Sequence, residues 1–355
     1  MTDKLALFPT TLSVTSDVDV FVQCPYKWSL NRVLWYRKRN QDYHRDLAFG
    51  AANAKVHQLV LEAYYKDFLP EEEAIQVGID FINTEFSLAY QLSGSDEPVK
   101  NPTKMVEALQ RYFKEIPLDR IDGIVPFLCS DLAQSIEKSF YLELPFTHPE
   151  TGQPLLLSAK PDMLGIEAYT GKTILIDDKT AGQSGNGSSE GEQATMWRYK
   201  LGNQMVQYAK VINSQKDKIG FNEVTHGEIR LIVLTQSKMG KVGTAIPKNK
   251  PFVERYHFEL SGWYQETWYK NLVGHIVPAM LEGYKKLKEG SSTPYQRSYG
   301  NCISYFRPCF FKEHCTEASW QNVEERYGLE QLVFNKDTGE VLTLAERRKE
   351  LGLEV

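Results

Sequence analysis

Four charged residues in the middle of the chain have the types and spacing of a metal-dependent site. Asp162 lies in one β-prone run, and Asp177, Asp178 and Lys179 end the run "ILIDDK". Because side chains alternate along a strand, Asp177 and Lys179 should share one face while Asp178 points away. Mg²⁺ takes oxygen ligands and keeps several waters, so a carboxylate on each of two adjacent strands is enough to hold it.

Such a cation, with a lysine beside it, suits the hydrolysis of phosphodiester bonds. The cation polarises a phosphoryl oxygen and activates a bound water, and the lysine can orient that water or balance charge. The ordinary alternative is a solvated strand face, with Asp162 serving the turn after Pro161. The unbroken apolar residues 174–176 favour a strand covered on both faces, where charges are costly unless they are paired or bound to a metal.

Three of the five cysteines lie close together near the end of the sequence. They are Cys302, Cys309 and Cys315, interleaved with aromatic residues. Clustered cysteines in a chain without an export signal are more often metal ligands than disulfides. Thiolate sites usually have four ligands, so the segment predicts a metal site that lacks one ligand locally. Cys129 is most simply a small buried apolar residue.

Composition excludes several classes of protein. The 355 residues are 42% hydrophobic and 25% charged, which is ordinary for a globular chain. No apolar run approaches the length of a membrane span, and the N-terminus lacks the architecture of a signal peptide. The net charge is −5, so any nucleic-acid binding must come from local basic patches. We therefore expect a cytoplasmic protein that does not contact membranes.

The pattern of elements is helical at first and mixed afterwards. Apolar spacing predicts a helix around residues 56–64 and further helices up to about residue 117. Runs 138–146, 154–168 and 172–180 predict strands, with a hairpin turn at residues 169–172. A helix at 195–214, a strand at 227–236 and a long helix at 263–290 follow. We interpret the helices expected at about 65–135 as an insertion that could cover a substrate channel.

Four motifs, in this order, resemble the RecB-like branch of the PD-(D/E)xK nuclease superfamily. That branch carries a helical histidine motif, a P-D motif, a D-x-K motif and a Q-x-x-x-Y motif. The matching residues are His57 with Glu62 in looser spacing, Pro161 with Asp162, Asp177 with Lys179, and Gln204 with Tyr208. The resemblance implies an α/β fold: a restriction-endonuclease-like core whose mixed central sheet is flanked by helices.

The resemblance also implies roles for these residues. His57, Asp162 and Asp177 would hold Mg²⁺ or Mn²⁺, and Lys179 would serve catalysis. Gln204 and Tyr208 are four apart on one helix face, so both can reach the same substrate strand. Glu62 lies about 140° from His57 around a helix, so we do not assign it to the metal. The ordinary alternative for His57 is a partly buried helix histidine.

A subset of RecB-like nucleases carries an iron–sulfur cluster, and such a cluster would account for the grouped cysteines and their missing fourth ligand. In that subset one N-terminal cysteine joins three C-terminal ones, so the resemblance implies a 4Fe–4S cluster on Cys24, Cys302, Cys309 and Cys315. The cluster would act as a clasp that closes a very long loop. The spacing between the first two C-terminal cysteines departs from the commoner pattern. Zinc on the same four thiolates is the rival, and we discount His314 because it adjoins Cys315.

Together these observations predict one nuclease domain over residues 1–355, with an insertion at about 65–135, a cysteine cluster at 302–315 and a tail at 316–355. The predicted activity is that of a metal-dependent exonuclease on single-stranded DNA or DNA ends, in recombination, repair or phage DNA processing. The gene would be bacterial or phage-borne, and a helicase, recombinase or integrase is a possible partner. Two alternatives remain: a CRISPR-adaptation nuclease that trims spacer precursors with an integrase, and a non-catalytic DNA-binding scaffold.

Overall fold

A computed structural model gives the fold of most of the chain. It describes residues 5–38, 45–94, 99–118, 123–126, 136–183, 197–235, 251–298, 303–304, 307–309, 311, 315, 329–334 and 341–353. Cys129, Cys302 and residues 236–250, a stretch with four lysines, lie outside the described residues. Two compact units form: Met1–Asp42 with Tyr141–Ser158 and Glu266–Val355, and Tyr43–Phe140 with Ala159–Gln265. None of the described helices has the length and apolar character needed to cross a membrane.

The second unit is a mixed five-stranded sheet with helices on both faces. Its strands run in the order β3-β6-β7-β8-β9, and only β7 and β8 pair in parallel. The strands are β3 (Ile124–Pro126), β6 (Met163–Glu167), β7 (Thr173–Gln183), β8 (His226–Thr235) and β9 (Phe252–Glu259). The helices are α3 (Arg45–Tyr65), α4 (Glu71–Phe81), η2 (Ile82–Phe86), α5 (Ser87–Leu92), α6 (Pro102–Glu115), α8 (Asn203–Asn213) and α9 (Lys216–Ile219).

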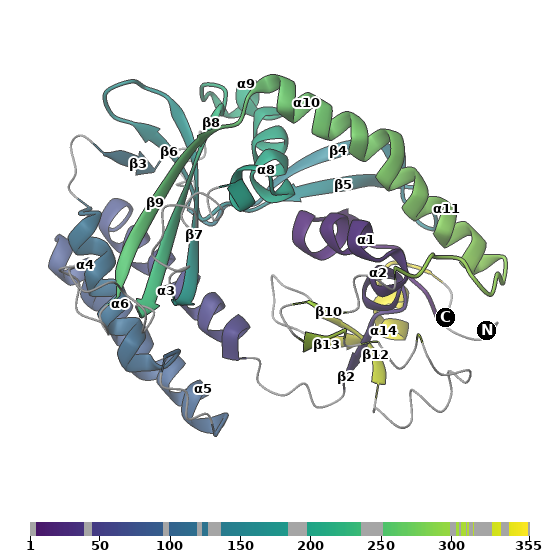
Figure 1. Cartoon of the computed structure of the whole chain (residues 1–355), viewed down its shortest axis with the longest axis horizontal. Helices are drawn as coiled ribbons and strands as arrows, with labels where there is room; N and C mark the ends of the chain where they lie inside the picture. The colour runs from purple at the N-terminus through teal and green to yellow at the C-terminus, as the bar shows by residue number, and fades with distance from the viewer. Residues whose placement is uncertain are drawn as a thin grey trace. The chain divides into compact units, whose positions relative to one another are not determined.

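Helices α3, α4 and α6 lie on one side of this sheet and α8 lies on the other (Figure 1). One apolar core joins α3, α4 and α6 to β6, β7 and β8. Gly78 of α4 allows the close approach to α3, because a Cβ there would meet Val60 Cγ2 at 2.7 Å. Within the insertion expected at about 65–135, the described helices α4 and α6 therefore pack on the sheet of this unit. That the insertion covers a substrate channel stays a prediction.

The hairpin that carries the charged residues forms as predicted. β6 and β7 are antiparallel, and Met163 lies opposite Ile176. Gly171 supplies the positive φ of 66° that the connecting turn needs. Residues 174–176 are buried, as the apolar run indicated, because β7 is an interior strand with helices on both faces. The charged residues thus follow directly from the buried centre of the sheet.

The first unit gathers both ends of the chain. It contains the sheets β1-β5-β4 and β13-β12-β2 and the hairpin β10-β11. The strands are β1 (Thr11–Leu12), β2 (Tyr36–Lys38), β4 (Phe140–Thr147), β5 (Pro154–Ala159), β10 (Ile303–Ser304), β11 (Arg307–Pro308), β12 (Leu329–Phe334) and β13 (Val341–Thr343). The helices are η1 (Val14–Val18), α1 (Asp19–Gln23), α2 (Pro25–Arg32), η3 (Leu272–Ile276), α11 (Val277–Lys288) and α14 (Leu344–Glu350), with α10 (Gly262–Asn271) leading into η3.

The helix predicted at 263–290 and the predicted tail at 316–355 both lie in this unit. The long helix at 263–290 forms as α10, η3 and α11, and the π-helical turn η3 ends at Ile276, two residues before Pro278, which cannot donate a backbone hydrogen bond. The segment treated as a tail contains folded elements, since β12 pairs with β2 and α14 begins with a capping box at Thr343 and Glu346.

Candidate active site

The predicted catalytic residues of β7 and α8 meet on one face of the sheet. Lys179 Nζ lies 2.5 Å from Asp177 Oδ2. Gln204, in the first turn of α8, donates a hydrogen bond to Asp177 Oδ1 at 3.4 Å and another to the Tyr208 hydroxyl at 3.0 Å. The i, i+4 spacing of Gln204 and Tyr208 therefore presents both side chains beside the Asp177–Lys179 pair.

Asp162 joins this group from the neighbouring strand. One of its carboxylate oxygens accepts a hydrogen bond from the backbone N–H of Asp178. Burial raises the pKa of Asp162, and the negative charges of Asp177 and Asp178 raise it further. Burial also raises the pKa of Asp177, although the adjacent Lys179 opposes the rise. Two buried carboxylates that repel one another are the setting in which a bound cation stabilises the ionised forms.

Lys179 and Tyr208 respond to the same negative charge. Burial lowers the pKa of Lys179, but attraction to Asp177 and Asp162 outweighs it and raises that pKa overall, so the lysine stays cationic. Burial raises the pKa of Tyr208 to about 12, and the charge of Asp177 adds to the rise. Tyr208 is therefore a neutral hydrogen-bonding group here rather than a base.

His57 lies on the opposite face of β7, against Asp178. Its Nδ1 atom is 2.9 Å from Asp178 Oδ2, and both side chains are buried. We expected Asp178 to point away from Asp177 and Lys179, which it does. Asp178 is held there in a buried network of hydrogen bonds.

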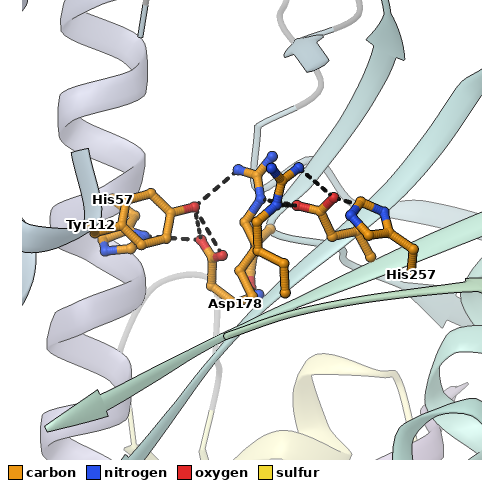
Figure 2. Close-up of polar contacts among 8 residues, drawn as sticks. His57, Tyr112, Asp178 and His257 are labelled. Atoms are coloured by element: carbon orange, nitrogen blue, oxygen red, sulfur yellow. Dashed lines mark hydrogen bonds and ion pairs between the residues drawn. The ribbon is translucent and has the colours of Figure 1, made fainter. Parts of the chain in front are cut away.

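The network extends from α3 and α6 through β8 to β9 (Figure 2). The Tyr112 hydroxyl lies 3.1 and 3.3 Å from the two oxygens of Asp178, and Arg230 Nη1 donates to that hydroxyl at 3.0 Å. Arg230 pairs with Glu228 at 2.5 Å, and Glu228 also contacts Arg255 at 2.8 Å and His257 at 3.0 Å. Neither Tyr112 nor this chain of ion pairs had a motif that could have marked it in the sequence.

The donor chemistry of the site fits a hard divalent cation. Asp162 and Asp177 supply carboxylate oxygens, and one or two carboxylates suffice for Mg²⁺. The Nε2 atom of His57 is buried and has no hydrogen-bond partner among the described residues. His57 and the two carboxylates are not gathered into one cluster, however, and the described part of the chain contains no group of three such side chains placed to hold a metal.

The cysteine region lies in the first unit. Cys24 caps α2, and its Sγ accepts a hydrogen bond from Lys27 N at 3.5 Å. Burial raises the pKa of Tyr26 to about 12, and the nearby Cys315 and Cys24 add to that rise. Arg297 lies 4.7 Å over the Tyr26 ring and donates to the carbonyl of Cys315 at 3.3 Å. Cys24 and Cys315 thus lie near one tyrosine, and Cys24, Cys309 and Cys315 take part in no disulfide within the described part of the chain.

The sequence matches the PD-(D/E)XK nuclease superfamily over residues 11–315. The match covers most of the chain, and the mixed sheet with helices on both faces fits the core of such a nuclease. The chain therefore belongs to the PD-(D/E)XK nuclease superfamily, whose members are generally metal-dependent nucleases. No curated protein matches the chain.

Proposed function

We propose that the protein is a metal-dependent exonuclease that hydrolyses single-stranded DNA or DNA ends. The observation that carries the proposal is the group formed by Asp162, Asp177 and Lys179 in a chain of this superfamily. A bound Mg²⁺ or Mn²⁺ supplies Lewis-acid chemistry and makes water more acidic. Asp162 and Asp177 would hold the cation, and Lys179 would stabilise negative charge that develops on the phosphate.

Side chains next to α8 support a single-stranded substrate. Trp197 and Trp263 are 47% and 76% exposed, which is unusual for large aromatic residues. Lys200 Nζ lies 5.1 Å over the Trp197 ring, and the Tyr264 hydroxyl reaches the carbonyl of Leu201 at 3.4 Å. Exposed rings can stack on unpaired bases while a lysine contacts phosphate, and this segment leads directly into Gln204.

The activity is tested with single-stranded oligonucleotides labelled at the 5′ end or the 3′ end. The wild-type protein should shorten them with Mn²⁺ and leave them intact with EDTA, and Asp177→Asn should be inactive in both. The order in which the two labels are released gives the polarity. Rapid cutting of a closed single-stranded circle would contradict an exonuclease, and DNA binding without any metal-dependent cleavage would favour a scaffold.

We also propose that Cys24, Cys302, Cys309 and Cys315 hold a 4Fe–4S cluster. The closeness of Cys24 and Cys315 to Tyr26 supports a shared site for the two ends of the chain. Protein purified without oxygen should be brown and contain about four iron atoms per chain, as a cluster on four thiolates requires. Cys24→Ser should lose that iron, while Cys129→Ser should keep it. Stoichiometric zinc in a colourless protein would replace the cluster with a zinc site, and full iron in Cys24→Ser would exclude the clasp.

A further inference from the structure

An ion pair that no sequence motif marked lies next to Asp162. Lys160 Nζ is 3.1 Å from Glu137 Oε2. The backbone places this pair, because the N–H of Glu137 donates to the carbonyl of Asp162 at 3.0 Å and Ile136 forms an antiparallel bridge with Met163. Both members of the pair belong to the second unit and are attached to the segment that supplies Asp162.

The backbone of Glu137 adopts a conformation that residues other than glycine rarely take. Its φ is 53°, in the left-handed region, where a Cβ atom is crowded by the backbone. Such a conformation persists where the surrounding contacts enforce it, and it is found most often at functional sites. Here the hydrogen bond to Asp162 enforces it, so the Glu137 carboxylate is held at a fixed place beside that residue.

The two members of the pair differ in their exposure to solvent. The side chain of Glu137 is 13% exposed, whereas that of Lys160 is 56% exposed. Lys179, which pairs with Asp177, is 29% exposed. Lys160 is therefore a more accessible cation than Lys179, and its ammonium can leave Glu137 without opening the core of the unit.

A DNA strand needs positive charge at this place. Each of its phosphates is negative, and Asp162 and Asp177 would repel a phosphate that approaches them. A lysine beside Asp162 offsets this repulsion and donates charge-assisted hydrogen bonds to phosphate as readily as to carboxylate. Because a partly exposed ion pair contributes little stability, a phosphate can replace Glu137 on Lys160 at a small cost.

We propose that Lys160 binds a backbone phosphate of the substrate strand beside Asp162, and that Glu137 competes with this phosphate for the lysine. The proposal rests on the function proposed above, since it requires a DNA strand at Asp162. In the free protein Glu137 holds the ammonium of Lys160. When the strand binds, the phosphate takes the place of the carboxylate, so Glu137 lowers the affinity of the site for DNA.

The phosphate contact is tested by the binding of a fluorescein-labelled oligothymidylate to the full chain in EDTA, measured by anisotropy at several salt concentrations. Lys160→Ala should weaken binding and reduce the slope of log Kd against log salt by about 0.7, the value for one phosphate contact on a single strand. Lys160→Arg keeps the charge and should retain the wild-type slope. Lys172→Ala removes an exposed lysine between β6 and β7 and should also retain it.

The competition is tested by a double-mutant cycle in the same assay. Glu137→Gln should tighten binding by about 2- to 5-fold, the range expected for a partly exposed ion pair. The gain should disappear in the Lys160→Ala background, because no ammonium is left to release. An equal gain in both backgrounds would show that Glu137 acts only by general repulsion, and weaker binding by folded Glu137→Gln would show that it positions the lysine; either result would overturn the competition.

Cleavage with Mn²⁺ gives a second readout of the phosphate contact. Lys160→Ala should raise KM by more than it lowers kcat, because it removes binding that the ground state and the transition state share. A wild-type salt slope or a wild-type KM in Lys160→Ala would overturn the phosphate contact and leave the proposed function standing. A wild-type protein that neither binds nor cleaves single-stranded DNA would instead remove the function on which the proposal rests.

Discussion

The two faces of β7 place adjacent residues in opposite electrostatic settings. On the α8 face, burial raises the pKa of Asp177, and Lys179 beside it is about 29% exposed through its side chain. On the α3 and α6 face, Asp178 has a lowered pKa because His57, Arg230 and Tyr112 compensate its charge. One face thus has repelling carboxylates that a cation could neutralise, and the other is already neutralised by protein groups.

A single strand can therefore serve chemistry on one face and stability on the other. Period-2 alternation sends neighbouring side chains to opposite layers, so a reactive group and a structural ion pair can be one residue apart. The raised pKa of Asp177 makes its ionised form costly to the fold, whereas the lowered pKa of Asp178 marks a net favourable interaction. Functional residues and stabilising residues are therefore separated by face rather than by position along the chain.

The largest effect should come from Lys179→Ala. Loss of its charge beside Asp177 should lower the cleavage rate by about 1,000-fold, the cost of removing a preorganised electrostatic group. The folded state should persist, because the lysine is partly exposed and pairs with Asp177 on the α8 face of β7, here called the reactive face. Cleavage of labelled DNA and circular dichroism would check this, and cleavage at the wild-type rate would show that the reactive face has been assigned wrongly.

Glu228→Gln should affect stability without touching the reactive face. It removes a buried carboxylate that faces Arg230, Arg255 and His257, which should cost roughly 3 kcal/mol of unfolding free energy at pH 7. Urea denaturation would measure the loss. Arg255→Gln removes only the partly exposed partner of the same carboxylate and should cost less.

The pH dependence of that loss follows from the direction of the pKa shift. Burial would raise the pKa of Glu228, but Arg230 and Arg255 outweigh it and lower that pKa below its ordinary value of 4.5. The unfolded chain then binds the proton more tightly, so the contribution of Glu228 is complete above about pH 5 and is lost as pH falls through the folded pKa. The difference between wild type and Glu228→Gln should shrink in acid, and a difference that grows below pH 4 would contradict the ion pair.

The smallest effect should come from Gln204→Ala. Its bonds to Asp177 and Tyr208 are neutral-donor contacts at 3.4 and 3.0 Å, so their loss should slow cleavage by about 10-fold. Gln207→Ala is not a suitable control because Gln207 is fully buried, whereas Lys210→Ala changes a residue in the last turn of the same helix. Single-turnover cleavage rates of Gln204→Ala and Lys210→Ala would show whether only the first variant is slowed.

Much of the reactive face could be predicted from the sequence, because its signals are local. The run "ILIDDK" specified a buried strand with charges at its end, and the four-residue spacing of Gln204 and Tyr208 specified one face of a helix. The hairpin, its turn and the strand after α8 formed as expected. The same alternation correctly separated Asp178 from Asp177.

The other face could not be predicted, because its partners are distant in sequence. Asp178 meets His57 and Tyr112 across 121 and 66 residues, and Arg230 joins them from a strand paired in parallel with β7. Such contacts depend on how helices pack on the sheet, and nothing in the spacing of α6 marks Tyr112 as different from its apolar neighbours. The pairing of β12 with β2 is equally non-local, so the sequence pattern alone led us to predict a tail at residues 316–355.

One matched pair of variants tests the division of β7 most directly. Asp177→Asn and Asp178→Asn make the same chemical change in adjacent residues on opposite faces. Mn²⁺-dependent cleavage and the urea unfolding midpoint should be measured on both. We expect Asp177→Asn to unfold at or above the wild-type midpoint and to cleave about 1,000-fold more slowly, whereas Asp178→Asn should unfold earlier and still cleave at high Mn²⁺. Wild-type cleavage by Asp177→Asn, with an inactive and fully stable Asp178→Asn, would contradict it.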